Sequence, residues 1–553
     1  MEGKKVLVIG SSLSGIQSAL DMAEEGKLVY LVESAPGLSG EKLFPVDYLK
    51  HKTPFVSSKW EEAKKHPNIH IISNGVIEDA RKENGSFKIK IKKTALRVLE
   101  DKCNDCKECI KVCPVNLRDD YSNGLGLRTA VDYFNSETKS YGIIKERPIC
   151  EETCPVHLDV RGYVGLIADG KYKEALNLIR EKLPFPATIG RICPHPCEEK
   201  CNRANKDAPL CIRDLKRFVA DAEIEDGYDE IIQKAKPNGK KVAIIGAGPA
   251  GLACAHDLAV MGYEVVIFEE LPVAGGMLAV GIPKYRLPRD LLNKEIDIVT
   301  KLGAQIKTGI RIGKDMSVDD LFNQGFESVF IAVGAHKGQN LRIDGEDTTG
   351  VVSGVTYLRD LNLGKEVQLG KKVAVIGGGN VAMDSARSSL RFGAKEVSIL
   401  YRRSREEMPA SGEEIDAALA EGIKFEYLVA PQQVLIDNGK VAGLKCIRMQ
   451  LGEPDASGRR RPVTIEGSEF DIELDMIIPA IGQKSDLSFL PENDTVETTK
   501  WGTIVADSRQ CCTNRQGIFA GGDCVTGPNI AIEAVAAGKK AALSIDEYLR
   551  RIS

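Results

Sequence analysis

The 553-residue sequence contains no apolar run of the ~18–20 residues that a membrane-spanning helix needs. Its amino terminus, MEGKKVLVIG, enters an apolar strand at once and lacks the layout of a signal peptide. A formal net charge of −4 implies no basic face, which argues against non-specific nucleic-acid binding. These absences predict a cytoplasmic protein without a membrane span, and the length predicts about three to five domains.

The 15 cysteines are also not distributed in a pattern that indicates a disulfide scaffold. Ten of them lie between Cys103 and Cys211, and in a reducing compartment such clustering favours metal ligation. The C-terminal half lacks a redox C-x-x-C, because Cys511 and Cys512 are vicinal and Cys446 is single. A disulfide reductase of thioredoxin-reductase type is therefore disfavoured on geometric grounds.

Two glycine fingerprints of the same form lie 131 residues apart. GAGPAG at 246–251 is followed by a strand that ends at Glu269, and GGGNVA at 377–382 by one that ends at Arg402 and Arg403. A carboxylate at that place accepts hydrogen bonds from a ribose diol, whereas guanidiniums bind phosphate oxygens. The pair predicts FAD at the first fingerprint and NADPH at the second.

A third fingerprint begins the chain but lacks its middle glycine. Residues 4–10 are predicted to form a strand, 10–26 a helix and 28–34 a second strand. Glu33 stands at the ribose position, yet Ser12 adds a side chain where a pyrophosphate would approach the backbone. The stretch to about residue 100 is too short for a complete dinucleotide domain. We expect an incomplete Rossmann-like unit that serves the fold, with a bound flavin as the alternative.

The run C-x-x-C-x-x-C-x-x-x-C-P at 103–114 has the spacing of a ferredoxin-type [4Fe–4S] site. A structural zinc knuckle is the alternative. In two-cluster ferredoxins the fourth cysteine serves the other cluster, so the assignment of the last cysteine stays open. The candidate ligands are Cys103, Cys106, Cys109 and Cys113.

Residues 146–235 are predicted to be helical and to hold at least one further cluster, with two as the alternative. The stretch 163–183 has the spacing of one amphipathic helix. GRICPHPCEEKC at 190–201 is too rich in cysteine for an ordinary core. Buried free thiols are a credible alternative only for Cys211. The candidate ligands here are Cys150, Cys154, Cys193, Cys197, Cys201 and Cys211.

Several longer motifs carry a resemblance to a known module. They are GRICPHPC (190–197), GAGPAGL (246–252), GGMLAVGIPKYRLP (275–288), GGGNVAMD (377–384), YRRSREEMPA (401–410), AIGQ (480–483) and AGGDC (520–524). Through them the chain from about residue 146 resembles the NADPH-oxidising small chain of bacterial glutamate synthase. The same module recurs in the flavin subunit of ferredoxin-dependent NADH:NADP transhydrogenases and in the amino-terminal part of dihydropyrimidine dehydrogenase.

The first ~115 residues resemble a different protein. LVIG…LVES, HPNIHIIS…GSFKIKIKK and the 103–114 motif are similar to the amino-terminal region of the flavin subunit of heterodisulfide reductase. In that family the region is an incomplete Rossmann unit followed by a cluster, which supports a structural role for the first unit.

The resemblance implies FAD, NADP(H) and two or three [4Fe–4S] clusters as cofactors. It implies hydride transfer from nicotinamide to flavin without an acid–base side chain, so no catalytic residue is named. Asp523 is expected at the ribityl chain, and a helix from about Asn529 is expected to point its N-terminus at the flavin ring. The expected cofactor-binding residues are Gly246, Gly248, Pro249, Ala250, Gly251, Glu269, Glu270, Gly275, Gly276, Met277, Leu278, Ile282, Arg286, Leu287, Gly334, Gly377, Gly379, Asn380, Val381, Ala382, Arg402, Arg403, Gly482, Gly522, Asp523, Asn529, Ile530 and Ala531.

Two departures from the module concern its clusters. No C-x-x-C pair stands directly upstream of Cys150, so either one of the usual clusters is missing or the 103–114 run supplies ligands. Where the family has a Gln or Glu ligand, this chain has Lys216 and Arg217. A protonated lysine does not ligate iron, which makes Cys211 a candidate replacement.

The predicted fold class is therefore α/β. The predicted domains are an incomplete Rossmann unit (1–100), a ferredoxin-like segment (101–145), a helical iron–sulfur domain (146–235), an FAD domain (236–350 and 470–553) and an NADP(H) domain (351–469). No second substrate domain is apparent, so the electron acceptor is expected in a partner subunit, such as an NAD(H)-binding flavoprotein or a ferredoxin. One hypothesis is an electron-bifurcating complex that couples NADP(H), NAD(H) and ferredoxin. The other is an electron donor to a glutamate synthase-type enzyme, against which the front ~115 residues argue.

Overall fold

The fold is given by a computed structural model that divides the chain into two compact units, Met1–Arg147 and Pro148–Ser553. Among the residues that the structure describes, every helix is too short or too polar to cross a membrane. The described residues are 5–11, 13–33, 53–72, 75–83, 86–93, 116–118, 127–129, 131–135, 140–143, 148–226, 234–454, 458–490 and 496–552.

The first unit contains a small parallel sheet with β2 in its centre, in the order β1-β2-β3. Helices α1 and α3 pack with this sheet around Leu31 and Trp60. The predicted strands and helix of the damaged fingerprint are therefore present. The elements are β1 (Lys5–Ile9), α1 (Leu13–Glu24), β2 (Leu28–Val32), α3 (Thr53–Lys65), β3 (Ile69–Ile72), β4 (Gly75–Glu83), β5 (Ser86–Lys93), β6 (Asn116–Arg118), β7 (Leu127–Thr129), β8 (Val131–Asn135) and β9 (Ser140–Ile143).

The second unit begins with a cysteine-rich helical region, residues 148–226. The single amphipathic helix expected over 163–183 is wrong, because α6 ends at Ala168 and α7 begins at Tyr172. A capping turn at Gly170 separates them, and the Lys171 N–H returns to the Leu166 carbonyl. The elements are α5 (Ile149–Glu152), α6 (Val160–Ala168), α7 (Tyr172–Arg180), α8 (Pro186–Ile192), α9 (Pro196–Glu199), η3 (Asn202–Asn205) and α10 (Ile212–Asp226).

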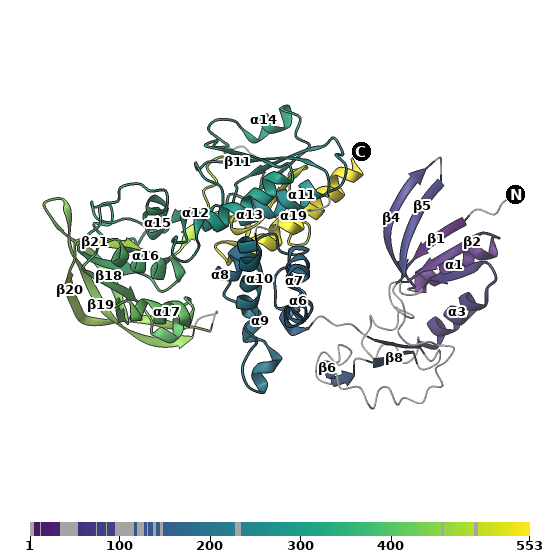
Figure 1. Ribbon diagram of the computed structural model, residues 1–553, viewed down its shortest axis with the longest axis horizontal. Helices are drawn as coiled ribbons and strands as arrows, with labels where there is room; N and C mark the ends of the chain where they lie inside the picture. Colours follow the sequence, from purple (N-terminus) through teal and green to yellow (C-terminus); the bar gives the residue numbers. More distant parts are fainter. Residues whose placement is uncertain are drawn as a thin grey trace. The chain divides into compact units, whose positions relative to one another are not determined.

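The first fingerprint region is built on a parallel five-stranded sheet, in the order β12-β11-β10-β13-β23. The last strand and the last helix come from the C-terminal end of the chain, and α19 lies along α11 (Figure 1). The elements are β10 (Lys241–Ile245), α11 (Pro249–Val260), β11 (Glu264–Glu269), α12 (Met277–Val280), α13 (Arg289–Lys301), β12 (Gln305–Thr308), α14 (Val318–Asn323), β13 (Ser328–Ile331), β14 (Lys337–Gly338), β22 (Gln483–Lys484), β23 (Ile518–Ala520), α18 (Asp523–Thr526) and α19 (Ala531–Arg551).

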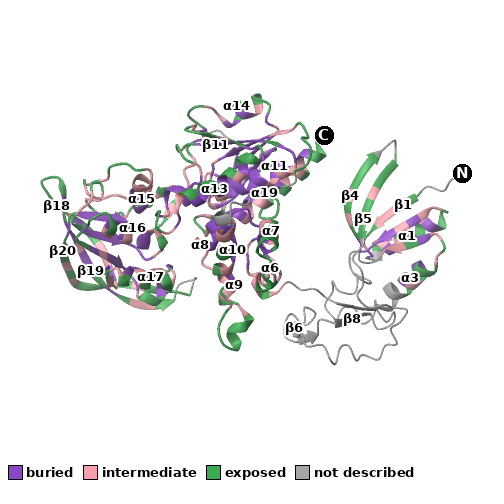
Figure 2. Cartoon of the chain, in the orientation of Figure 1, coloured by how far each residue is buried: buried purple, intermediate pink, exposed green. Residues whose placement is uncertain are grey.

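The second fingerprint region inserts between β14 and β22. Its parallel sheet has the order β17-β16-β15-β21, and an antiparallel sheet, β18-β19-β20, follows in the chain. Strands β19 and β20 form a long hairpin in which β19 alternates between buried and exposed residues, whereas β20 has no buried residue (Figure 2). The elements are α15 (Gly354–Asn362), β15 (Lys372–Ile376), α16 (Asn380–Arg391), β16 (Glu396–Tyr401), η4 (Arg405–Glu407), α17 (Gly412–Ala420), β17 (Lys424–Tyr427), β18 (Val429–Asp437), β19 (Lys440–Pro454), β20 (Arg460–Glu473) and β21 (Met476–Pro479).

The cysteine-rich region and the first fingerprint region share one continuous hydrophobic core. The buried carboxyl of Glu295, on α13, accepts the N–H groups of Ala187 at 2.6 Å and Thr188 at 2.9 Å, at the start of α8. Burial raises the pKa of Glu295 to about 7. The domain limits expected from the sequence stay predictions, and these contacts show that two of the expected domains are packed as one body.

Candidate functional site

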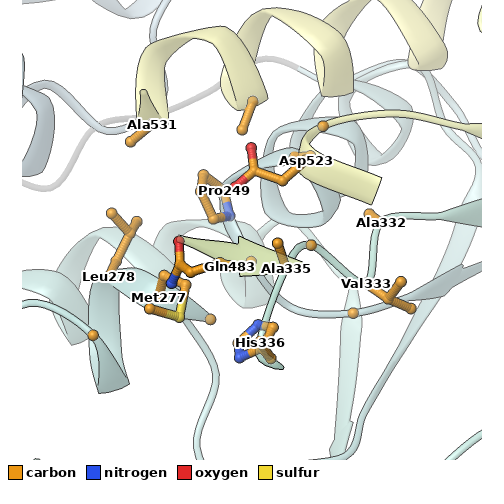
Figure 3. A pocket seen from close by; sticks show the side chains of 18 of the residues that line it. Pro249, Met277, Leu278, Ala332, Val333, Ala335, His336, Gln483, Asp523 and Ala531 are labelled. Atoms are coloured by element: carbon orange, nitrogen blue, oxygen red, sulfur yellow. The ribbon is translucent and has the colours of Figure 1, made fainter. Parts of the chain in front are cut away.

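A cavity of about 310 Å³ lies where the strands of the first fingerprint sheet end. Its volume is within the range of ~300–1,000 Å³ that small-molecule sites occupy. Figure 3 shows Asp523, Gln483 and His336 around it, with Met277 and Leu278 on one wall. The expected cofactor-binding residues that line it are Gly246, Gly248, Pro249, Ala250, Glu269, Glu270, Gly276, Met277, Leu278, Ile282, Arg286, Gly334, Asn380, Val381, Gly522, Asp523, Asn529, Ile530 and Ala531.

Nine expected cofactor-binding residues do not line this cavity. Leu287 is fully buried in the core behind it, and Arg402 and Arg403 lie at the far end of β16. The nine are Gly251, Gly275, Leu287, Gly377, Gly379, Ala382, Arg402, Arg403 and Gly482.

Glu269 ends β11 with its carboxylate inside the protein. It accepts the Ala247 N–H at 2.7 Å and the Leu271 N–H at 2.8 Å. Burial raises the pKa of Glu269, and these two backbone N–H groups oppose that rise. The carboxylate is thus fixed next to the glycine turn, where an acceptor can receive a ribose diol. The adjacent Glu270 points to the exposed side and pairs with Arg311 at 2.6 Å.

The glycine turn has room for a ligand backbone. A Cβ atom on Gly276 would lie 2.8 Å from the Gly248 Cα, so these two chain segments approach each other as only glycines allow. Together with Pro249 at the start of α11, they present bare backbone to the cavity. A pyrophosphate fits such a surface because backbone N–H groups at a helix start attract anions.

Asp523 and the start of α19 form the opposite wall. Burial raises the pKa of Asp523 to about 6, against the backbone N–H of Asn529, which donates to this carboxyl. Helix α19 begins at Ala531 with Ile530 as its N-cap, close to the start expected at Asn529. The arrangement fits the ribityl and ring ends of a flavin.

Some cavity residues were missed by the sequence argument. His336 is half-buried and lines the cavity, and burial lowers its pKa, which favours the neutral imidazole. Arg289 does not line the cavity, but it donates to the carbonyls of Leu287 at 2.7 Å and of the lining residue Leu278 at 3.2 Å. Neither residue belongs to a fingerprint, although Arg289 directly follows the YRLP motif.

The second fingerprint region reaches the same cavity. Asn380 and Val381 at the start of α16 line it, as does Asp384 one turn later. Arg286 donates to both oxygens of Asp384, at 2.8 and 2.7 Å, and its other terminal nitrogen pairs with Glu414. This charged cluster joins the two fingerprint regions beside the cavity, where a nicotinamide would meet a flavin.

The two expected phosphate-binding arginines differ in exposure. Arg402 is exposed, and it makes no hydrogen bond or ion pair with another residue in the described part of the chain. Arg403 is buried at 7% exposure, and its Nε donates to the Arg460 carbonyl at 2.8 Å. Arg402 is therefore available to a ligand, whereas Arg403 is held by the protein.

The cysteine-rich region brings five of its six expected ligands near one another. Cys154, Cys193 and Cys197 line a small hollow with Tyr163 and Lys216, and Cys150 lies close enough to Cys201 for a charge there to raise its pKa. Burial raises the pKa of Cys197 to about 12, and Lys216 opposes that rise.

Among the described residues, no three donors are arranged to hold a single metal ion. A set of donors made up of cysteine thiols fits an iron–sulfur cluster, which cysteine thiolates hold.

The other cysteine ligands stay predictions. Cys211 is exposed and stands just before α10, so its role is open. The four ligands expected in the front segment lie outside the described residues: Cys103, Cys106, Cys109 and Cys113.

The residues that flank Cys193 extend the cysteine-rich region to the cavity. Ile192, which ends α8, and Pro194 both line the cavity of the first fingerprint region. Cys193 lies between them in the chain and lines the hollow that Cys154 and Cys197 also border. Cys193 therefore borders the cysteine hollow, while both of its neighbours in the chain border the cavity.

Comparison with known proteins agrees with this geometry. The family model described as pyridine nucleotide-disulphide oxidoreductase matches residues 240–538. The model of dihydropyrimidine dehydrogenase domain II, 4Fe-4S cluster, matches 144–228, and that of a 4Fe-4S binding domain matches 96–118.

Three relatives cover about the same part of this chain. The NADP(+)-dependent formate dehydrogenase subunit beta of Moorella thermoacetica is 50% identical over 426 residues, covering 73% of this chain and 60% of that protein. The NADPH-Fe(3+) oxidoreductase subunit beta of Geobacter sulfurreducens is 45% identical, covering 72% and 63%. The glutamate synthase [NADPH] small chain of Escherichia coli is 36% identical, covering 73% and 89%. The chain thus spans about three fifths of the first two relatives.

Proposed function

The chain belongs to the pyridine nucleotide-disulphide oxidoreductase family and carries FAD, NADP(H) and [4Fe–4S] clusters, and on that premise we propose that it is the NADP(H)-linked subunit of a larger redox complex. It exchanges electrons between NADP(H) and a partner subunit. When bound, FAD supplies the conversion between the two electrons of a hydride and the single electrons that clusters carry.

The convergence of three regions on one cavity carries this proposal. Glu269 and Asp523 come from the first fingerprint region, Asn380 from the second, and Ile192 from the cysteine-rich region. A nicotinamide, a flavin and a cluster ligand can therefore be held around one space. Cys193 is the ligand nearest the cavity along the chain, so we assign to it the cluster that exchanges electrons with the flavin.

The residues around the cavity act by binding and orienting. Glu269 holds a ribose diol, and the bare backbone at Gly248 and Gly276 receives a pyrophosphate. The start of α19 directs partial positive charge toward the flavin ring, which favours negative charge there. Arg286 and Asp384 fix the second fingerprint region against this wall.

A partner subunit supplies the other substrate in this proposal. Two relatives are named as beta subunits, one of a formate dehydrogenase and one of an Fe(3+) oxidoreductase, so the same module serves different partners. The finer proposal is a cytoplasmic electron-bifurcating complex that couples NADP(H), NAD(H) and ferredoxin. The added front segment, with its 4Fe-4S domain match at 96–118, supports it because it offers a further cluster for a one-electron partner.

The role of Cys193 is tested by Cys193→Ser in the full chain, with Cys512→Ser as the control. After anaerobic mixing with NADPH, we expect flavin bleaching at the wild-type rate in both variants. The paramagnetic resonance signal of reduced clusters should be lost or strongly slowed only in Cys193→Ser. Cluster reduction at the wild-type rate in that variant would refute the assignment.

The coupling is tested on the native complex. NADPH oxidation is assayed with NAD, with ferredoxin, and with both. Turnover with NAD that never depends on ferredoxin would exclude bifurcation. The second candidate, a donor to a glutamate synthase-type enzyme, is supported by the relative of which this chain covers 89%. It predicts that a synthase subunit copurifies with the chain.

A further inference from the structure

A run of three arginines, residues 459–461, has no part in the fingerprints or the cluster motifs. Strand β20 begins within this run, and Arg460 pairs in register with Pro454 across the hairpin. The hairpin returns the run to the end of β16, 57 residues earlier in the chain. Arg460 is thus placed beside Arg403, the neighbour of Arg402.

Arg403 connects the two segments. Its side chain is buried, and its Nε donates to the Arg460 carbonyl at 2.8 Å. Its own carbonyl accepts the Leu428 N–H, which begins the next segment after β17. Arg403 therefore holds the position of Arg460 and is a positioning residue.

The Arg460 side chain is oriented but only partly satisfied. Its Nε donates to Glu407 Oε1 at 2.8 Å, and Glu407 is itself held by the Ser404 N–H at 3.1 Å. The side chain is 48% exposed, and its two terminal nitrogens have no partner within the described residues. Anchoring through Nε leaves the forked end of a guanidinium aimed outward, the geometry that binds phosphate oxygens.

We propose that Arg460 binds the 2′-phosphate of NADP(H) together with Arg402, a site that rests on the proposed function. Both side chains are available to solvent and both adjoin the turn 402–407. A phosphate monoester carries about −1.5 to −2 charges at pH 7, so a single free guanidinium would leave it under-neutralised. Arg405 is excluded because it pairs with Asp416.

The test uses the full chain and two probes that cannot be turned over. Adenosine 2′,5′-bisphosphate contains the 2′-phosphate, and 5′-AMP lacks it. Affinities are measured by calorimetry for wild type, Arg460→Ala, Arg460→Lys and Arg461→Ala. Arg461 is the matched control, since the neighbouring residue of a strand points to the opposite face.

For Arg460→Ala we expect about a 10-fold or greater loss of affinity for the bisphosphate, as for other charged hydrogen bonds. Its affinity for 5′-AMP should stay within about twofold of wild type, and Arg461→Ala should change neither. Arg460→Lys should fall between Arg460→Ala and wild type, because lysine keeps the charge and loses the fork.

Two results would overturn the inference. One is an unchanged bisphosphate affinity in Arg460→Ala, and the other is an equal loss for both probes, which would indicate a folding defect of the site. Unfolding midpoints of the variants distinguish that defect independently. A wild-type chain that does not prefer the bisphosphate to 5′-AMP would instead refute the NADP(H) assignment in the proposed function.

Discussion

The two fingerprint regions join the glycine turn to the second strand by the same hydrogen bond but differ in the residues at the end of that strand. Gly246 donates to the Phe268 carbonyl at 2.8 Å, and Gly377 donates to the Leu400 carbonyl at 3.0 Å. By this register Glu269 corresponds to Tyr401. Arg402 corresponds to Glu270, one position farther along the strand.

Tyr401 fills the place that a carboxylate takes in the first region. Its ring lies over Gly378, where a Cβ would come within 2.6 Å of it, and its hydroxyl donates to the Glu407 carbonyl at 2.8 Å. The first region therefore buries the carboxylate that is expected to bind ribose, and the second covers that place with an aromatic ring and exposes its charge at the edge. The ligand-binding charge is thus one residue farther along the strand in the second region, where the expected ligand changes from a ribose diol to a 2′-phosphate.

The largest expected effect comes from exchanging glycine and alanine at the third position of each fingerprint. A Cβ on Gly251 would lie 2.0 Å from the Gly246 carbonyl oxygen, whereas the second region accommodates Ala382 at the same position. We expect Gly251→Ala to abolish flavin retention. The reverse change, Ala382→Gly, should cost only about 1 kcal/mol, the penalty of glycine in a helix. Flavin absorbance per protein and unfolding midpoints measure both, and a flavin-replete Gly251→Ala protein would contradict the close approach.

The link between the two regions is next in magnitude. Arg286→Ala leaves Asp384 and Glu414 buried without their partner, and removal of one member of a buried pair costs about 3–5 kcal/mol. Burial raises the pKa of Asp384 to about 7 even with Arg286 present. Loss of the arginine raises that pKa further, so the destabilisation should be greater at pH 8 than at pH 6.

Denaturant unfolding at both pH values measures this effect, and Arg286→Ala/Asp384→Asn should recover part of the loss. Arg213→Ala is the control, because its pair with the exposed Glu413 is worth about 0–1 kcal/mol. Equal losses in Arg286→Ala and Arg213→Ala would show that the buried cluster does not hold the two regions together.

The third expected effect comes from removing Arg402, the exposed charge of the second region. Arg402→Ala should raise the KM for NADPH about 10-fold, a change of about 1.4 kcal/mol, and leave the KM for NADH unchanged. Arg403→Ala should in addition lower the unfolding midpoint, because Arg403 is buried and holds the β20 backbone. Steady-state kinetics with both nucleotides tests this. An unchanged KM for NADPH in Arg402→Ala would remove the reason for assigning NADP(H) to this region.

The sequence was sufficient to predict elements whose signals are local. The apolar strands of all three fingerprints and the glycine turns of the two intact ones are present, and the first unit has three parallel strands, as an incomplete Rossmann unit should. There Ser11 donates its N–H at 2.8 Å and its hydroxyl at 2.5 Å to Glu33, so a protein side chain already engages this carboxylate. The expectation of a unit that serves the fold stays a prediction, and this contact supports it.

Features that depend on distant residues could not be read from the sequence. Arg460 reaches Arg403 only because a long hairpin returns to β16, and Ile192 reaches the cavity only because the helical region shares a core with the first sheet. The helix expected over 163–183 failed because its periodicity continues across the Gly170 turn. Periodicity reports which face is buried, and it does not report where the chain reverses.

The smallest expected effect concerns Asp523, the buried acid of the first region, and the pH dependence of its contribution to stability. Within the described residues no cation shifts the pKa of Asp523, whereas Arg286 lowers that of Asp384. Burial raises the pKa of Asp523 from 3.8 to about 6, so in the folded, flavin-free protein this carboxyl is mostly protonated below about pH 6. Its contribution to stability is then complete below about pH 4 and is lost as the pH rises through about 6.

Between pH 5 and pH 7 this loss amounts to about 1.3 kcal/mol in the free energy of unfolding. Asp523→Asn removes the titrating group, so its stability should fall less than that of the wild type over the same interval. Unfolding of the flavin-free proteins at the two pH values measures the difference. Parallel pH profiles would mean that Asp523 is already ionised in its wall of the cavity, with the Asn529 N–H sufficient to hold the charge. The contrast between the two fingerprint regions would then rest on Glu269 and Tyr401.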